Sequence, residues 1–424
     1  MTSRKVIIGI DGVPFSLLDE LAEQGVMPCL RSLAGEGVFR PMLSSLPAVS
    51  AVSWSSIITG CNPGEHGIYG FTQMMPDTYT IAYPNYLSLK RPAFWQDEIE
   101  PCVIINVPFT YPAQQLNGCH IAGFVAPKIE KAVYPYSELT AIEGMGYRID
   151  VDAAMAQQSD LALYNQLFET HARREEVADY LWGKYDPAVF MPVFTGSDRL
   201  GHFGWRHWEQ QDHPDHDKFL EYFRRVDKTI ERIAVRLDAD DTLIVISDHG
   251  MEAAAHEVNL NAYLIEAGFL RLDDNESRKY DRIQEGSVAF ALEDGRVHLN
   301  ERGRYPRGSV EPGEQEALVA QLTEFLGQLQ VNGEKIAGQV HRRDDIYHGE
   351  NASVAPHLVV EPNPSFKLVG RLTTDLHQPS RLAGMHNEQA FILVKGPEAE
   401  QFVPEVPTVE DVVSILENCA GGKP

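Results

Sequence analysis

The chain has 424 residues with 43% hydrophobic and 9% aromatic content, which is typical of a soluble globular protein. Its formal net charge of −25 argues against a nucleic-acid-binding surface, because such surfaces are basic. The sequence shows no secretory h-region and no apolar run of transmembrane length, so no membrane partner is expected. The 5 cysteines are odd in number and lack C-x-x-C spacing, which favours reduced thiols and a cytoplasmic location.

Two short apolar segments end in carboxylate side chains. Residues 5–10 lead into Asp11, and residues 242–246 lead through Ser247 into Asp248 and His249. Such runs are typical of strands buried on both faces of a parallel sheet. Ligands gather at the carboxyl ends of these strands, so the pattern predicts a metal site. Each segment by itself is equally compatible with a strand followed by a turn.

A third apolar strand, residues 188–195, precedes Asp198 and His202. Because these two residues are spaced i and i+4, one helical turn would place both side chains on the same face, which suits a shared metal ion. The next histidines are interleaved with polar residues and Pro, so a solvated loop is predicted for His207, His213 and His216.

The remaining elements alternate between strands and helices. Apolar residues at helical spacing predict a helix over 15–33 that is broken at Gly25 and Pro28. The same periodicity predicts a helix over 217–237. Further helices are predicted over 175–182, 258–268, 314–331 and 409–416, the last capped by Thr408, and further strands over 102–107 and 390–394. This alternation is typical of an α/β fold.

Two more candidates are weaker when taken singly. Ser50 lies in a Ser-rich loop that leads into an apolar helix ending at Gly60. A hydroxyl at a helix start lies among unpaired backbone N–H groups, where a phosphate oxygen is also favoured. Ser50 and Ser53 would also serve as plain helix caps. His386 precedes the strand predicted at 390–394, and a lone histidine there is more often a loop residue than a ligand.

Together these motifs resemble the alkaline phosphatase superfamily, and within it the type I phosphodiesterase/nucleotide pyrophosphatase family. The resemblance is carried by Asp11-Gly12, by Ser50 ten residues before Gly60, by Asn62-Pro63-Gly64-Glu65-His66-Gly67 and by Asp248-His249-Gly250. It implies a three-layer α/β/α sandwich with a largely parallel central sheet and inserted cap elements. We expect a catalytic core over 1–270 with an elaboration around 72–185, an insertion over 271–380, and a return to the core over 381–424.

The resemblance also implies two divalent metal ions. Asp11, Asp248, His249 and the Ser50 oxygen would hold one ion, and Asp198, His202 and His386 would hold the other. Mixed nitrogen and oxygen ligation suits Zn²⁺, with Mn²⁺ or Fe²⁺ as alternatives. Ser50 would be the nucleophile and form a phosphoseryl intermediate on a small-molecule phosphate ester. Two bound cations would attract such a substrate despite the negative net charge.

Several functions remain open on this scaffold. A phosphodiesterase or nucleotide pyrophosphatase is favoured, and a phosphomonoesterase or phosphomutase is the first alternative. The second alternative is a catalytically silent metal-binding protein. A sulfatase is disfavoured, because Ser50 lacks the Pro and Arg that follow the nucleophile of that class. Ser53, Trp54 and His256 are candidate substrate contacts, although core packing is the stronger expectation for Trp54.

Overall fold

The computed structural model describes residues 3–273 and 279–421. The chain divides into two compact units. Unit 1 comprises Met1–Cys61, Asn85–Glu252 and His386–Pro424, and unit 2 comprises Asn62–Pro84 and Ala253–Met385. Unit 2 therefore consists of two segments that interrupt unit 1 in the sequence.

Unit 1 is built on an eight-stranded sheet with the strand order β2-β20-β9-β1-β8-β5-β6-β7. Its strands are β1 (Lys5–Ile10), β2 (Val38–Leu43), β5 (Cys102–Val107), β6 (Gly118–Ala122), β7 (Val133–Tyr134), β8 (Val189–Phe194), β9 (Thr242–Ile246) and β20 (Gln389–Lys395). All pairs from β9 through β1, β8 and β5 to β6 are parallel. The β2–β20, β20–β9 and β6–β7 pairs are antiparallel. The predicted α/β class with a largely parallel sheet is confirmed.

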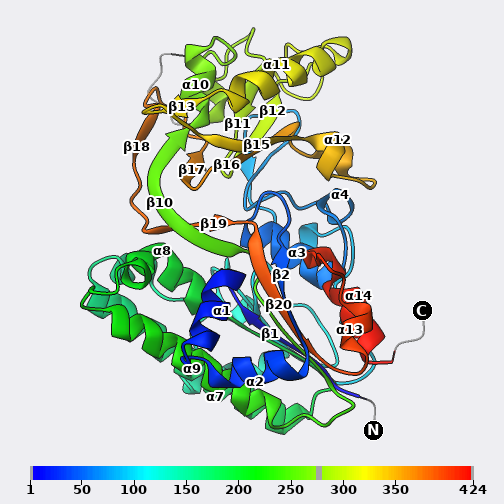
Figure 1. Cartoon of the computed structure of the whole chain (residues 1–424). Coiled ribbons are helices and arrows are strands. Elements are labelled where there is room, and N and C mark those ends of the chain that lie inside the picture. The colour runs from blue at the N-terminus through cyan, green and yellow to red at the C-terminus, as the bar shows by residue number, and fades with distance from the viewer. Residues whose placement is uncertain (1–2, 274–278, 422–424) are drawn as a thin grey trace. The chain divides into compact units, whose positions relative to one another are not determined.

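Helices cover both faces of this sheet (Figure 1). On one face α3 and α14 pack their apolar side chains against the strands in a single buried cluster. On the other face lie α1, α2, α7 and α9, as Figure 1 shows. The helices of unit 1 are α1 (Phe15–Glu23), α2 (Pro28–Glu36), α3 (Ser50–Thr59), α5 (Leu139–Gly144), α6 (Ala153–Ala156), α7 (Asp160–Tyr185), α8 (Gly196–Glu209), α9 (His216–Ala234), α13 (Ala399–Phe402) and α14 (Val412–Cys419).

Two helices differ in length from their predictions. Helix α7 begins well before residue 175, because the Ser159 side chain accepts a hydrogen bond from the Ala162 N–H and caps a first turn that the apolar pattern does not mark. Helix α8 continues past Asp198 and His202 to Glu209. His207 is therefore a fully buried helical residue, and its assignment to a solvated loop was wrong.

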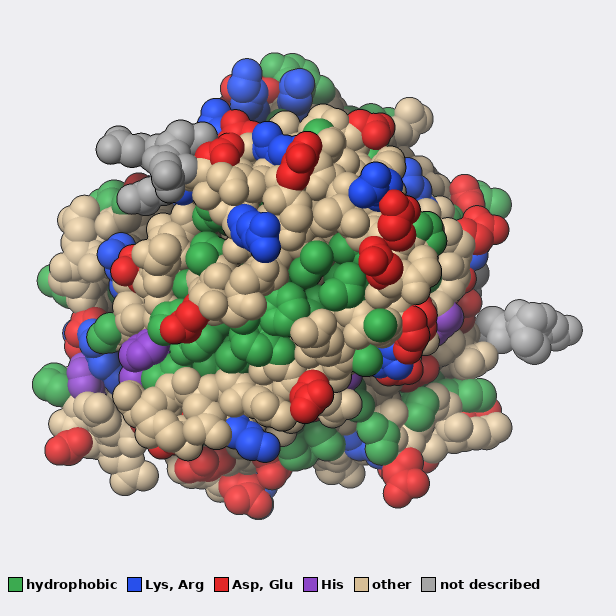
Figure 2. Space-filling model, turned by 90° about the horizontal axis from the view of Figure 1, so that it is seen from above, with side chains coloured by type: hydrophobic (Ala, Val, Ile, Leu, Met, Phe, Trp, Pro, Cys, Tyr) green, Lys and Arg blue, Asp and Glu red, His purple; other side chains and the backbone are tan. Residues whose placement is uncertain are grey.

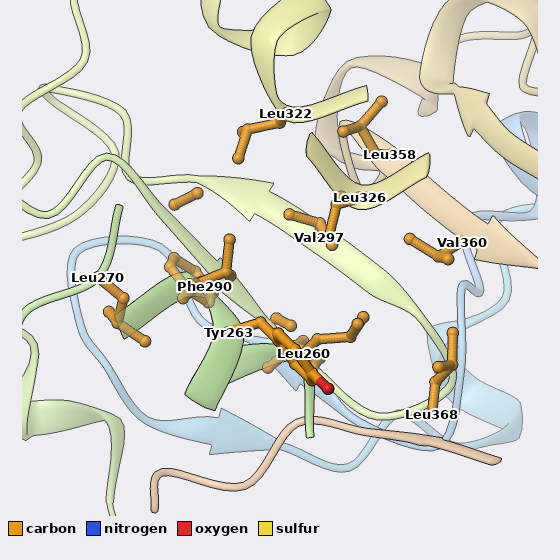
Figure 3. Close-up of a cluster of buried hydrophobic side chains, with 14 of the residues drawn as sticks. Leu260, Tyr263, Leu270, Phe290, Val297, Leu322, Leu326, Leu358, Val360 and Leu368 are labelled. Atoms are coloured by element: carbon orange, nitrogen blue, oxygen red, sulfur yellow. The ribbon is translucent and has the colours of Figure 1, made fainter. Parts of the chain in front are cut away.

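Unit 2 has its own hydrophobic core, part of which is drawn in Figure 3. Strands β11 (Ala289–Ala291), β12 (Arg296–Leu299), β16 (Leu358–Pro362) and β15 (Ala337–Arg342) form one antiparallel sheet. Strand β10 (Gly250–Asn259) pairs with β17 (Ser365–Val369) and β18 (His377–Pro379). Helices α10 (Leu260–Glu266) and α11 (Gln315–Gly327) supply further side chains to the core. Unit 2 also contains α4 (Pro63–His66), α12 (Arg343–Ile346) and the hairpins β3 (Gln73–Met74)–β4 (Ile81–Ala82) and β13 (Gln330–Val331)–β14 (Glu334–Lys335).

The Asn-Pro-Gly motif at residue 62 has a structural role within unit 2. The Asn62 side chain accepts a hydrogen bond from the Gly64 N–H and caps α4, while its Nδ2 donates to the Ile346 carbonyl. A Cβ atom at Gly64 would lie within van der Waals radii of the His348 carbonyl oxygen, so only glycine permits this approach. The motif therefore fastens its segment to the end of α12.

Acidic and basic side chains are interspersed over the face shown in Figure 2. None of the helices in the described part of the chain is long and apolar enough to cross a membrane. All five cysteines, which lie within the described residues, are free thiols.

Candidate metal centre

Three adjacent parallel strands of unit 1 deliver carboxylates to one edge of the sheet. Asp11 follows β1, Asp248 and His249 follow β9, and Asp198 lies in the first turn of α8 just after β8. Since β9, β1 and β8 are neighbours, their carboxyl ends lie side by side, which is where ligands bind in open α/β sheets. His386, on β19 (Gly384–Asn387), reaches the same edge next to β20.

The predicted Asp198, His202 and His386 set is assembled in the structure. His386 Nε2 lies 3.1 Å from Asp198 Oδ1 and 2.9 Å from His202 Nε2. The i, i+4 spacing on α8 brings His202 Nε2 to 3.4 Å from Asp198 Oδ1. The three ligand atoms lie within 4.8 Å of one another, close enough to hold a metal ion.

The second predicted set surrounds His249. Its Nε2 lies 3.3 Å from Asp248 Oδ2, 3.9 Å from Asp11 Oδ1 and 3.1 Å from the Ser50 hydroxyl. Asp11, Asp198 and His249 form a further group whose ligand atoms lie within 4.8 Å of one another. Because the His249 and His386 rings stack at 3.7 Å between centroids, the two sets adjoin. The structure therefore brings all seven predicted residues to one centre within unit 1.

The buried carboxylates of this centre fit a divalent cation. Asp11 and Asp248 are fully buried, yet Asp11 Oδ1 and Asp248 Oδ2 accept no hydrogen bond. Burial, together with the charges of Asp248 and Asp198, holds the pKa of Asp11 well above its usual value. An ionised carboxylate that is buried without a partner destabilises the folded state by an amount on the order of several kcal/mol. A bound cation would compensate this cost. Carboxylate and imidazole donors are also the ligands that Zn²⁺ prefers.

Asp198 differs because Arg199 and two histidines already surround it. Burial would raise the pKa of Asp198, but His202, His386 and Arg199 together hold it well below its usual value. Arg199 Nη1 lies 3.2 Å from Asp198 Oδ2, and Arg199 Nη2 lies 2.6 Å from Asp150 Oδ2. The sequence did not indicate this contact, because Asp150 lies far from Arg199 in the chain and in a segment without a recognisable motif. Arg199 thus fixes one oxygen of Asp198 and leaves the other facing the histidines.

The histidines are oriented by backbone carbonyls behind them. Nδ1 of His249 donates to the Gly250 carbonyl at 3.0 Å, and Nδ1 of His386 donates to the Ala48 carbonyl at 3.2 Å. Each bond places the ring proton on Nδ1 and leaves the Nε2 lone pair directed at the centre. Burial and the neighbouring His249 lower the pKa of His386 to about 3, so this ring is neutral, as a metal ligand must be.

The carboxylates are held by hydrogen bonds from outside the centre. Trp54 Nε1 donates to Asp11 Oδ2 at 3.0 Å, and the Gly12 N–H donates to Asp248 Oδ1 at 3.1 Å. Gly12 has a φ of +69°, and a Cβ atom there would lie 3.0 Å from the Asp198 backbone and side chain. The glycine after β1 therefore permits both the turn and the close approach of Asp198.

The three predicted substrate contacts lie in different settings. Trp54 is fully buried on α3 and packs against Gly9 while bonding Asp11. The Ser53 hydroxyl is buried and lies 2.8 Å from the Ser44 hydroxyl. His256 belongs to unit 2, where its ring stacks on Phe366. A contact of any of the three with substrate stays a prediction.

A family model described as type I phosphodiesterase/nucleotide pyrophosphatase matches residues 5–388 of the chain. Phosphonoacetate hydrolase from Sinorhizobium meliloti 1021, solved in complex with phosphonoacetate, has a TM-score of 0.63 at 14% identity and covers 99% of this chain and 96% of its own. Murine ectonucleotide pyrophosphatase/phosphodiesterase 5 has a TM-score of 0.56 at 13% identity and covers 99% and 96%. An inactive form of that murine protein, in complex with AMP, has a TM-score of 0.56 at 13% identity and covers 100% and 96%. No curated protein sequence matches the chain. At these identities the structural likeness establishes the fold, which is that of the alkaline phosphatase superfamily.

Proposed function

The chain belongs to the type I phosphodiesterase/nucleotide pyrophosphatase family, and we propose that it is a two-metal hydrolase of phosphodiesters that acts through a phosphoseryl intermediate on Ser50. One observation carries this proposal. The Ser50 hydroxyl lies 3.1 Å from His249 Nε2, beside two buried carboxylate oxygens without hydrogen-bond donors. A catalytically silent metal-binding protein has no chemical need for a hydroxyl at that position.

Asp11, Asp248, His249 and Ser50 would hold one ion, and Asp198, His202 and His386 would hold the second, with Zn²⁺ the best match to the donors. When bound, two such ions lower the pKa of a hydroxyl ligand and neutralise the charge of a phosphate ester. The residues behind them keep the donors in place, since Trp54 positions Asp11 and Arg199 positions Asp198.

In the proposed reaction, Ser50 Oγ gives its proton to solvent water and attacks phosphorus from the side opposite the leaving oxygen, which takes up a proton from solvent as it departs. The Ser50 O–P bond forms as the bond to the leaving oxygen breaks. Ser50 is the first residue of α3, so the positive end of the helix dipole stabilises the negative charge that develops there. Water then attacks phosphorus, and the Ser50 O–P bond breaks to return the hydroxyl. Two single displacements at phosphorus thus retain its configuration overall.

The preference for diesters is supported by the family, whose description names phosphodiesterases. A monoester carries an additional negative charge and usually requires additional cations. Arg199, the cation next to the centre, already pairs with Asp198 and Asp150. Arg199 is therefore committed to the protein, which leaves the diester as the better match.

The test compares bis(p-nitrophenyl) phosphate with p-nitrophenyl phosphate on metal-stripped protein reloaded with Zn²⁺ or Mn²⁺. We expect turnover that depends on the metal and is faster for the diester. Faster turnover of the monoester would replace the proposal with a phosphatase or mutase, and these two differ in whether solvent ¹⁸O enters the product. Phosphonoacetate is the third substrate, because one structural neighbour hydrolyses it. Turnover of phosphonoacetate above both esters would overturn the diester assignment.

A further inference from the structure

A second group of one carboxylate and two imidazoles lies at the C-terminal end of α8, within unit 1. Asp160 is the first residue of α7, His207 lies in the last turn of α8, and His213 lies in the loop before α9. Their ligand atoms lie within 4.8 Å of one another. This group shares no residue with the centre at the sheet edge.

His207 is the buried member of this group, with 0% of its surface exposed, and its Nε2 has no hydrogen-bond partner. Its Nδ1 lies 2.9 Å from the Tyr164 hydroxyl, which donates its single proton to the Asp215 carbonyl at 3.3 Å. With its proton directed at Asp215, Tyr164 can accept from His207 Nδ1–H, and in this tautomer the Nε2 of His207 carries a lone pair. Burial lowers the pKa of His207, which keeps the ring neutral.

The lone pair of His207 faces a carboxylate. Asp160 Oδ1 lies 3.4 Å from His207 Nε2, and two acceptor atoms at that distance repel each other unless a cation lies between them. Arg206 Nη2 also lies 3.4 Å from Asp160 Oδ1, so that oxygen already attracts positive charge. The C-terminus of α8 adds the negative end of a helix dipole to the same place.

His213 supplies the third donor. Its ring stacks on the His207 ring at 4.2 Å between centroids with an interplanar angle of 27°. Its Nδ1 accepts a hydrogen bond from the Asp215 N–H at 3.1 Å, and coordination by His213 exchanges this bond for a metal bond. Asp160 and His213 are half-exposed, so solvent reaches the remaining positions around a bound ion.

We propose that Asp160, His207 and His213 bind a divalent transition metal ion of the Zn²⁺ class, separate from the metals at the sheet edge. Two imidazoles and one carboxylate form a three-ligand site that is completed by water. Tyr164 orients His207 from behind, as outer partners do in metal sites. The ion would join the start of α7, the end of α8 and the loop before α9, and so steady the helix that carries Asp198 and His202.

Zinc content tests this proposal without reference to turnover. The full chain and the variants His213→Asn and Asp160→Asn are dialysed to equilibrium against buffered Zn²⁺, and bound zinc is measured by mass spectrometry. The matched control is His216→Asn, because His216 lies in the same region and bonds the His207 carbonyl but is not part of the group. Circular dichroism confirms that each variant is folded.

We expect each of the two variants to bind one zinc equivalent fewer than the wild-type chain, and the control to bind the same number. Binding of Co²⁺ provides a second readout. A variant that lacks one ligand set should lose part of the visible absorption of the bound Co²⁺. Unchanged zinc content in both variants would overturn the proposal. A loss of more than one equivalent would also overturn it, because the group would then act through the sheet-edge centre. A failure of the diesterase assay affects neither measurement.

Discussion

The two ends of α8 each present carboxylate and imidazole donors, but they differ in what surrounds those donors. At the N-terminal end, Asp198 and His202 meet residues from three strand ends, so carboxylates and histidines converge with the Ser50 hydroxyl. At the C-terminal end, His207 meets one carboxylate from a helix start and one histidine from a loop. The parallel sheet, more than the donor types, makes the first end a candidate catalytic centre.

Histidine burial by itself does not distinguish a site. His120 and His171 are buried and each has one ring nitrogen without a hydrogen-bond partner, as His207 does. His120 lies edge-on to Tyr86 and Trp95, and His171 stacks on Phe194. These two rings face aromatic neighbours, whereas the unpaired nitrogen of His207 faces a carboxylate. Among these three histidines, the neighbouring carboxylate therefore sets His207 apart.

The largest effect is expected from removal of the Ser50 hydroxyl at the N-terminal end. Ser50→Ala should lower turnover of bis(p-nitrophenyl) phosphate by at least ~1,000-fold, because no neighbouring group replaces the nucleophile. The control is Ser55→Ala, since Ser55 is on the same helix and its hydroxyl bonds the Ala51 carbonyl. Steady-state rates at saturating Zn²⁺ measure both variants. Wild-type rates in Ser50→Ala would show that Ser50 is not the nucleophile.

The next largest effect is expected when a candidate metal ligand at the N-terminal end of α8 is removed. His386→Gln should raise the Zn²⁺ concentration needed for half-maximal turnover by more than about 100-fold, because loss of an outer partner alone costs 10- to 100-fold in affinity. The control is the same substitution at His377, because His377 also lies on a short strand, β18, but belongs to unit 2. A zinc titration of activity measures both. An unchanged zinc requirement in His386→Gln would remove this residue from the ligand set.

A smaller effect is expected from the outer partner at each end of the helix. Trp54→Phe keeps an aromatic ring at this buried position but removes the N–H that bonds Asp11, and Tyr164→Phe removes the hydroxyl that bonds His207. Each should weaken zinc binding at its own end by about 10- to 100-fold. Competition with a zinc-sensitive dye measures the affinities. Weakening of both ends by one substitution would show that the two groups are a single coupled site.

Local strand and helix patterns singled out Asp11, Asp198, His202, Asp248 and His249 as candidates, whereas Ser50 and His386 joined them through the family resemblance. The strand at 242–246 and the one-turn spacing of Asp198 and His202 were predicted and are observed. The contacts that were missed join distant segments. Arg199 contacts Asp150 from the segment before α6, and His207 contacts Asp160 at the start of α7. Neither contact is indicated by a periodic or local pattern in the sequence.

The same difference between local patterns and distant contacts applies to Trp54. Its position in an apolar helix predicted burial, and burial is observed, but nothing in the sequence indicated that its indole N–H would bond the carboxylate after β1. Apolar periodicity reports which face of a helix is buried, and it does not report which polar atom lies opposite that face. Outer partners of a metal centre are therefore harder to predict than the ligands.

The smallest effect concerns a buried histidine that belongs to neither end of α8. Burial lowers the pKa of His120 to about 4, below the ordinary value near 6.5. Below pH 6.5 the unfolded chain therefore takes up a proton that the folded chain does not, so stability present above pH 6.5 is lost as the pH falls toward 4. Between pH 7 and pH 5 this amounts to about 2 kcal/mol, at 1.36 kcal/mol per pKa unit. His120→Phe should remove that part of the pH dependence.

Urea unfolding of the wild type and of His120→Phe at pH 7 and pH 5, with chelator present, measures this difference in the free energy of unfolding. An equal loss of stability in the two proteins would contradict the assigned pKa. Repeating the comparison with Zn²⁺ in place of chelator adds the decisive contrast. His120 has aromatic neighbours, so its contribution should not change with zinc, because metal binding requires further donors around the ring. A zinc-dependent contribution from His120 would mean that a buried imidazole binds metal without a carboxylate beside it, which would undo the distinction drawn between His207 and the packed histidines.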